Sequence, residues 1–195
     1  MGKRKSSQAC LRGEWKEVST RSVKLPEIDS ESFSTYLQWL YTNEVVVSDE
    51  DITDEHIVKA RYGERLPVFQ RHFAAFFKLA ILADKLGNAR LANAVVDRII
   101  LVARVVRLGP SACNIATVYS QLPESSPVRS LVVAYYATEV KAEFMTKHKE
   151  QFPYQFIFDL MVHSKKREEE KTSNTPSYPG ERCRYHQHNE KVPNV

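Results

Sequence analysis

The sequence predicts an α+β fold in which helices predominate, and three observations lead to this prediction. Apolar residues make up 43% of the 195-residue chain, which is enough for a buried core and excludes global disorder. Residues 71–107 contain two long apolar segments separated by Gly87, the pattern of a helical hairpin. Residues 23–25 alternate apolar and polar side chains and residues 45–47 are three valines, so each run predicts a short strand.

The first expected helix begins near Asp29 or Ser30, either of which can supply the N-cap, and ends near Tyr41. Its apolar side chains recur at a spacing that places them on one continuous stripe. Trp39 projects about 60° from Phe33, beside this stripe, at ~100° per residue. The members of the stripe are Phe33, Tyr36, Leu37, Leu40 and Tyr41.

The two helices of the expected hairpin differ in character. Residues 71–86 are apolar on almost every side, which is typical of a helix that is buried over most of its surface. Gly87 ends this helix, and Asn88 caps the next one, whose inner face carries leucine, valine and isoleucine. The two helices are therefore expected to pack as a tight pair.

Three further helices are expected after the hairpin. Ser111 opens the first of them and Pro123 closes it, and the pair Ser126-Pro127 opens a long helix that includes Met145. A short helix is expected over residues 152–162. Beyond it the chain has no apolar stripe to bury, so it is expected to be largely disordered.

The charge distribution argues against a nucleic-acid partner. The net charge is +4, but residues 1–24 carry +5 and residues 163–195 carry +2, so the middle of the chain is negative and no uniformly basic face is indicated. The sequence has no secretory signal and no apolar stretch long enough to cross a bilayer. Three scattered cysteines form no disulfide framework. These features predict an intracellular protein, cytoplasmic or nuclear, with no membrane partner.

No pattern in the sequence predicts an enzyme. The six glycines form neither a phosphate-binding loop nor a nucleophile elbow, and no zinc-protease helix motif is present. Cys113 lies in the first turn of an expected helix, where a thiolate is favoured, but it has no base beside it in the sequence and is interpreted as a small packing residue. We therefore expect no catalytic residues, no cofactor and no small-molecule substrate.

Two segments contain potential metal ligands, and neither predicts a metal site. The acidic residues within 49–55 lack the register of a calcium loop. Cys183, His186 and His188 provide only three ligands, whereas a structural zinc site takes four, and the nearest upstream histidine is His163. Whether this cluster serves as a short recognition segment or as a plain tail stays open.

Several segments, in order, resemble a BTB/POZ domain of the kind found in fungal proteins. The resemblance lies in Trp15-Lys-Glu17, Val23-Lys-Leu-Pro26, Phe33-x-x-Tyr-Leu-x-Trp-Leu-Tyr-Thr42, Leu79-Ala-Ile-Leu-Ala-Asp-Lys-Leu86 and Leu91-Ala-Asn-Ala-Val95. The stretch that begins Ser126-Pro-Val-Arg129 and the cluster around Cys183 are also similar to such proteins. The opening strands and helix of the family are absent, so the chain is expected to be N-terminally truncated. The implied organisation is a BTB/POZ-like domain over 7–104, a helical extension over 105–163 and a disordered tail over 164–195.

This resemblance implies a protein–protein interaction module that mediates self-association or adaptor binding. One alternative is a substrate adaptor of a cullin-type ubiquitin ligase, although Val47-Ser-Asp49 only approximates the hydrophobic-x-Glu element of cullin-binding members. Another alternative is a transcription-associated regulator. The expected partner is thus a protein, a second copy of the chain or a cullin-type ligase scaffold. Without the opening elements, apolar surface is expected to be exposed on residues 31–41 and 71–86.

Overall fold

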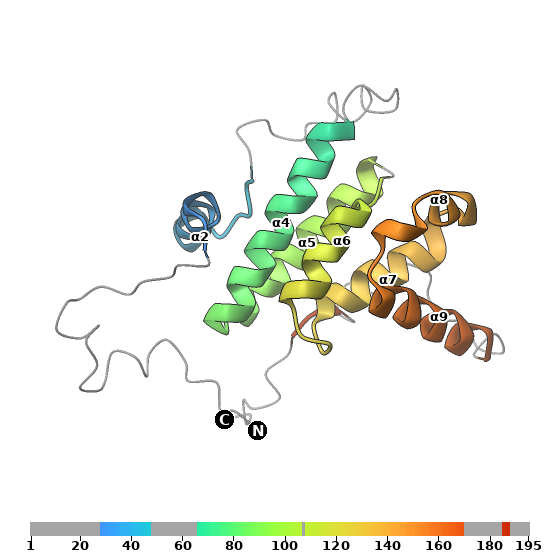
Figure 1. Cartoon of the computed structure of the whole chain (residues 1–195). Coiled ribbons are helices and arrows are strands. Elements are labelled where there is room, and N and C mark those ends of the chain that lie inside the picture. Colours follow the sequence, from blue (N-terminus) through green and yellow to red (C-terminus); the bar gives the residue numbers. More distant parts are fainter. Residues whose placement is uncertain (1–27, 48–65, 107, 170–184, 188–195) are drawn as a thin grey trace, which may run out of the picture.

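The computed structural model describes residues 28–47, 66–106, 108–169 and 185–187, and these form a helical assembly (Figure 1). The first described helix packs against one side of a central group of helices, and a C-terminal group follows. The elements are α2 (Ser30–Thr42), α4 (Leu66–Leu86), α5 (Ala89–Val106), α6 (Ala112–Gln121), α7 (Pro127–Glu139), α8 (Ala142–Lys147), the short 3₁₀ helix η1 (Lys149–Gln151) and α9 (Tyr154–Glu169).

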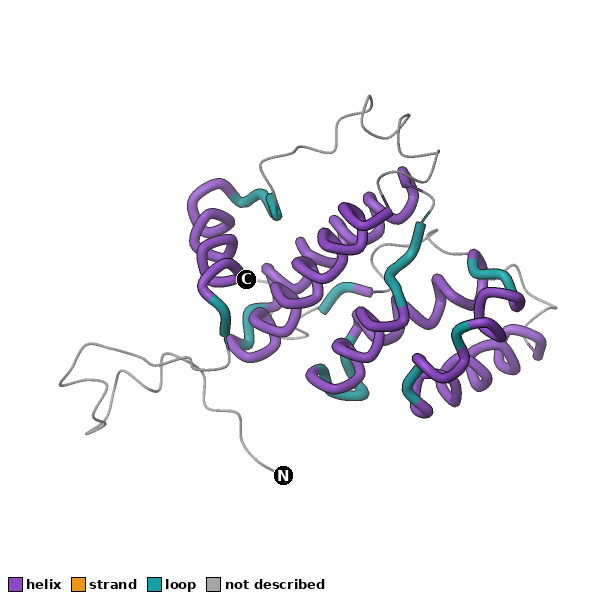
Figure 2. Tube along the Cα trace, turned by 45° about the horizontal axis from the view of Figure 1, so that its top comes forward, coloured by secondary structure: helices purple, strands orange, loops and turns teal. Residues whose placement is uncertain are grey.

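The predicted α+β class is wrong, because the part of the chain that the structure describes contains helices and loops but no strand (Figure 2). Residues 45–47 follow α2 as a loop, and none of the described residues forms a strand beside them. Val45 is instead buried as a member of the hydrophobic core, so its β-branched side chain is accommodated by packing rather than by strand pairing. The other expected strand, residues 23–25, lies outside the described residues. The fold thus gives no support to a BTB/POZ-like sheet.

Helix α2 begins and ends with well-formed caps. Both carboxylate oxygens of Asp29 accept hydrogen bonds at 2.9 Å from Ser32, one from its backbone N–H and one from its hydroxyl. Burial acts to raise the pKa of Asp29, but the hydrogen bonds from Ser32 and the charge of Lys78 outweigh it and hold the pKa below its ordinary value. At the other end Asn43 adopts a left-handed conformation, with φ of 59°, and its N–H donates to the carbonyl of Trp39. These caps fix the helix at the bounds that the sequence predicts.

Helix α4 is the centre of the molecule, lying between α2 on one side and α5 and α6 on the other (Figure 1). Its phenylalanines 73, 76 and 77 are at most 1% exposed. The apolar surface expected to be exposed on residues 71–86 is therefore covered, and α6 of the helical extension provides part of the cover. On α2, by contrast, Trp39 packs inward while Phe33, Leu37 and Leu40 of the predicted stripe stay 37–52% exposed.

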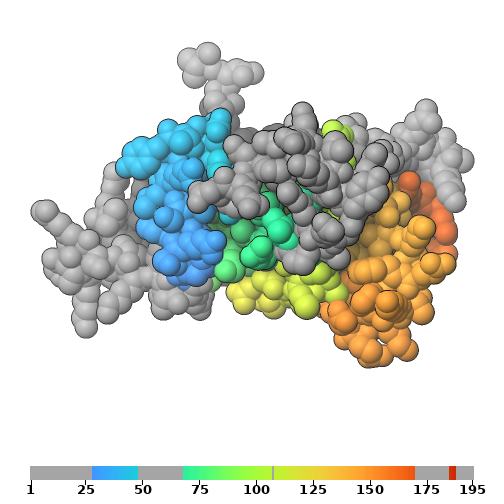
Figure 3. All heavy atoms as spheres, turned by 90° about the horizontal axis from the view of Figure 1, so that it is seen from above, coloured from blue at the N-terminus to red at the C-terminus, as the bar shows by residue number. Residues whose placement is uncertain are grey.

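Helix α6 joins the central helices to the C-terminal group, since it contacts α4 as well as α7 and α9. An aromatic cluster fills the space between α6, α7 and α9. The ring of Phe156 lies edge-on to Tyr119 and Tyr136, with centroids 5.5 and 5.1 Å apart, and stacks against Phe152. Edge-to-face contacts of this kind add to the stabilisation from burial. Figure 3 shows α2 and the C-terminal helices at opposite ends of the molecule.

Two parts of the segment 164–195, which the sequence predicts to be largely disordered, are described by the structure: residues 164–169 and 185–187. Helix α9 extends to Glu169, beyond the expected boundary at His163, and Lys165 and Glu168 form an ion pair of 3.0 Å along it. Further on, residues 185–187 dock against α5. Tyr185 is only 8% exposed, and the backbone of Gln187 forms two hydrogen bonds, of 2.7 and 3.1 Å, with the side chain of Asn93.

Replacing Tyr185 with alanine is expected to lower the melting temperature by about 2–4 °C, which corresponds to roughly 1 kcal/mol in a chain of this size. The loss is limited because the short segment can undock without unfolding the helices. Circular dichroism during heating measures the melting temperature. Gln187→Ala is the matched control, because Gln187 uses only backbone atoms in its hydrogen bonds to Asn93. An unchanged melting temperature for Tyr185→Ala would contradict docking.

Among the described residues, none of the helices combines the length and the apolar character needed to cross a lipid bilayer.

Candidate functional site

A cleft of about 440 Å³ lies between α7 and α9, and Tyr185 forms part of its wall. It is the most distinctive polar feature of the C-terminal group, because it combines charged side chains with apolar ones. Helix α7 contributes Arg129, Ser130 and Val133. The other lining residues are Glu124, Gln155, Phe158, Asp159, Val162, His163, Lys166 and Tyr185.

Arg129 is the buried cation of this cleft. The side chain lies in the first turn of α7, where Pro127 occupies the start of the helix, and the residue is 9% exposed. Its Nη2 donates a hydrogen bond of 2.7 Å to the carbonyl of Tyr119, and its guanidinium carbon is 4.4 Å from the centre of the Tyr119 ring. Within the described ranges, no carboxylate forms an ion pair with Arg129, and its Nε is buried without a hydrogen-bond partner.

Asp159, the carboxylate on the α9 side of the cleft, has both oxygens engaged. One accepts a hydrogen bond of 2.8 Å from the Tyr119 hydroxyl, and the other accepts one of 2.8 Å from Gln155. Burial, reinforced by the hydrogen bond and the negative charge of Asp159, raises the pKa of Tyr119 well above its ordinary value. Tyr119 therefore remains a hydrogen-bond donor throughout the physiological range and holds Asp159 in place.

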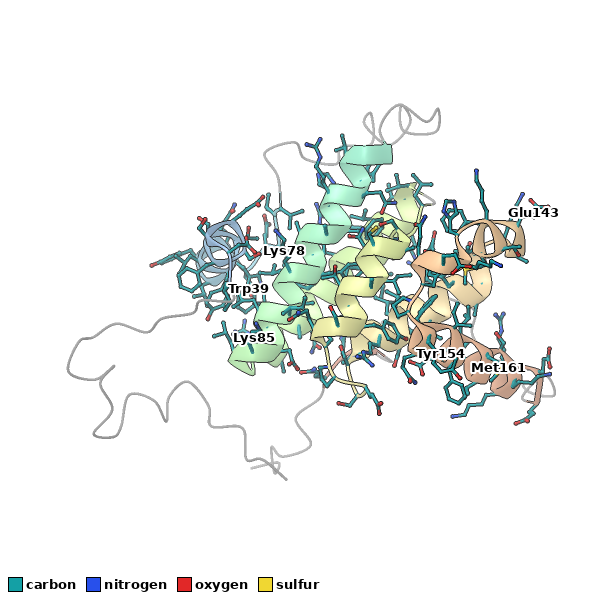
Figure 4. The ribbon with its side chains drawn as sticks, in the orientation of Figure 1. Trp39, Lys78, Lys85, Glu143, Tyr154 and Met161 are labelled. Carbon is teal, nitrogen blue, oxygen red and sulfur yellow. The ribbon has the colours of Figure 1, made fainter. Side chains whose placement is uncertain are left out.

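An apolar surface adjoins the cleft along the outer side of α9. We call it the α9 ridge; Tyr154 is 82% exposed on it and Met161 is 52% exposed. Figure 4 shows both side chains on the side of the molecule remote from Trp39. Phe158 belongs to the ridge and also lines the cleft, so the two features are continuous. The ridge consists of Tyr154, Ile157, Phe158 and Met161.

A second exposed apolar surface, the α2 face, lies at the other end of the molecule. It consists of four residues of the predicted stripe, of which Tyr41 is the most exposed at 90%: Phe33, Leu37, Leu40 and Tyr41. Trp39, which the sequence places beside the stripe, packs inward and anchors the helix on the core. The α2 face is thus an apolar surface on a capped helix.

Of the residues considered from the sequence for catalysis or metal binding, the structure describes Cys113, His163 and His186. Cys113 is exposed in the first turn of α6, so its interpretation as a small packing residue is wrong. His186 lies 3.1 Å from a carboxylate oxygen of Asp97 on α5. Cys183, His188 and the acidic segment 49–55 lie outside the described residues. Across the described ranges, no three His, Cys, Asp or Glu side chains are grouped so that they could hold a metal ion.

Sequence reasoning did not identify the cleft. In the sequence, Arg129 stands out only as part of the stretch that begins at Ser126, and nothing in its position along the chain indicates that its charge is buried. A helical arginine beside an apolar face is normally solvated, so this burial depends on the contact between α6 and α7. The one available signal was the Ser-Pro start, which fixes Arg129 in the first turn.

Comparison with models of protein families, with curated proteins and with solved structures finds no match to this chain.

Proposed function

We propose that this chain is a protein–protein interaction module without catalytic activity. The observation that carries the proposal is the α9 ridge, a run of exposed aromatic and aliphatic side chains on one helix. Aromatic residues and arginine are enriched at the energetic centres of protein interfaces. The ridge has both, because it continues into the cleft that contains Arg129.

The α2 face supports an adaptor role within this function. It is separated from the α9 ridge by the central helices, so the two apolar surfaces do not combine into one (Figure 4). A molecule with two such surfaces at opposite ends can hold two partners at once or link copies of itself. Adaptor binding and self-association thus remain the two forms of the proposal, and the concentration dependence of the molecular mass distinguishes them.

Replacing apolar side chains of the α9 ridge with serine is expected to abolish binding of the partner protein or second copy and to leave the fold intact. A photo-crosslinking amino acid at position 157 should give a crosslinked product, either with a defined partner or with a second copy, whereas the same amino acid at position 165 should not. Ile157 is 39% exposed on the ridge and Lys165 lies on the charged part of the same helix, so the two positions form a matched pair. The triple variant Tyr154→Ser, Ile157→Ser, Met161→Ser should retain the helical circular dichroism of the wild type.

Sedimentation over a dilution series determines whether the crosslinked product is a homo-oligomer. A chain that stays monomeric at every concentration and gives no product from position 157 would contradict an interaction role for this surface. Crosslinking of equal yield from positions 157 and 165 would also contradict it.

A further inference from the structure

We propose that the α7–α9 cleft is a carboxylate-binding site, in which Arg129 receives an acidic group of a partner protein. The geometry of the cleft alone supports a carboxylate-binding site. That the carboxylate belongs to a partner protein rests on the proposed function.

Arg129 places a positive charge in a buried position. A guanidinium remains protonated in proteins, and burying it without a counter-charge is costly. The described partners of Arg129 are a backbone carbonyl and an aromatic ring, both of which are neutral. A carboxylate bound in the cleft would give Arg129 the ion-pair partner that it lacks among the described residues, and the planar guanidinium matches a carboxylate with two parallel hydrogen bonds.

The other charges of the cleft limit the ligand to a single negative charge. Lys166 adds a second cation, while Glu124 and Asp159 add two carboxylates. Asp159 is already held by Tyr119 and Gln155, so it is not displaced toward Arg129. A dianion such as phosphate would meet both carboxylates at short range, and this repulsion makes it the less suitable ligand.

The apolar lining indicates what accompanies the carboxylate. Val133, Val162 and Phe158 lie in the same cleft as Arg129, and Phe158 continues into the α9 ridge. A volume of about 440 Å³ is within the usual range for a ligand pocket. The expected ligand is therefore a short peptide in which an aspartate or glutamate is next to an aliphatic or aromatic residue.

Amide chemical shifts of the full chain in ¹⁵N–¹H spectra test the proposal with three probes: N-acetyl-Leu-Glu-amide, its glutamine counterpart N-acetyl-Leu-Gln-amide, and inorganic phosphate. The glutamate peptide should shift the amides of Ser130, Gln155 and Lys166 in a saturable way. The glutamine peptide should bind about tenfold more weakly, because a hydrogen-bonded charge contributes roughly 1.4 kcal/mol or more. Equal binding of the two peptides, stronger binding of phosphate, or no shift at these amides would each overturn the proposal.

Two neighbouring lysines provide matched variants that do not disturb the core. Lys166→Gln should weaken binding of the glutamate peptide about two- to fivefold, the range expected for an exposed charge, whereas Lys165→Gln should leave it unchanged. Equal effects of the two substitutions would show binding by general charge and would overturn the site. Arg129→Lys should weaken binding about tenfold or more if the variant folds, since lysine cannot form the paired hydrogen bonds. Failure of the peptides together with crosslinking from position 157 would leave the proposed function intact and remove only this inference.

Discussion

Replacing Phe156 with alanine is expected to reduce the free energy of unfolding by about 3–5 kcal/mol, the range for removal of a buried phenylalanine. The side chain is fully buried, at 0% exposed, and it contacts the rings of Tyr119, Tyr136 and Phe152. Its removal leaves a cavity where α6, α7 and α9 meet. A loss of this size is a large fraction of the roughly 5–15 kcal/mol that stabilises a typical domain.

Urea unfolding followed by circular dichroism measures this loss. The control is Ile157→Ala, one residue further along the same helix, where the side chain is 39% exposed and the expected loss is about 1 kcal/mol or less. Helix α6 links the C-terminal group to α4. The urea unfolding transition of Phe156→Ala should therefore include the unfolding of the central helices. Equal stability of the two variants would mean that the aromatic cluster does not hold the C-terminal group together.

Replacing Gly109 with alanine is expected to reduce the free energy of unfolding by about 3 kcal/mol, at the upper end of the range for overpacking a core. A Cβ atom at this position would overlap the ring of Tyr135. That ring is buried, with the residue 6% exposed, so it has little room to move. The loop between α5 and α6 therefore requires glycine for close approach, not for an unusual backbone conformation.

Gly87→Ala is the informative control for this prediction. Gly87 has φ of +64° and open space around the position of a Cβ, so alanine there costs only the backbone strain of about 1–2 kcal/mol. A double-mutant cycle of Gly109→Ala with Tyr135→Leu should show favourable coupling, because the smaller side chain relieves the overlap. A melting temperature of Gly109→Ala above that of Gly87→Ala would contradict the proposed overlap.

Much of the helical pattern could be predicted from local sequence. The pair α4 and α5, separated by Gly87, and α6 with its Ser111 cap follow from apolar spacing and capping residues. The expected long helix from Ser126 breaks at Val140, whose extended conformation allows the chain to turn before α8. The spacing of apolar residues alone could not show this break, because Met145 continues the same pattern. Met145 is partly buried against the core only because the chain turns after α7 and packs back on it.

The remaining differences arise where tertiary contacts outweigh local preference. The three valines at 45–47 have strand-forming side chains, but the described part of the chain places no strand beside them and Val45 is buried in the core instead. The sequence predicts that the charged end of α9 belongs to the tail because this segment has no apolar stripe to bury, although lysine, arginine and glutamate are good helix formers. Arg129 and Asp159 are 30 positions apart in the sequence, so a cleft that contains both could be found only from the fold.

The position of Tyr185 determines when the α7–α9 cleft becomes complete during synthesis of the chain. Tyr185 lines the α7–α9 cleft and also contacts the region between α4, α5 and α7. A nascent chain that has reached Glu169 contains every helix that the structure describes, and these helices can fold as they leave the ribosome, since folding proceeds from the N-terminus during translation. Its cleft still lacks one wall. A nascent chain therefore acquires its helices first and its complete cleft later, which delays binding at that cleft until the segment around Tyr185 has emerged.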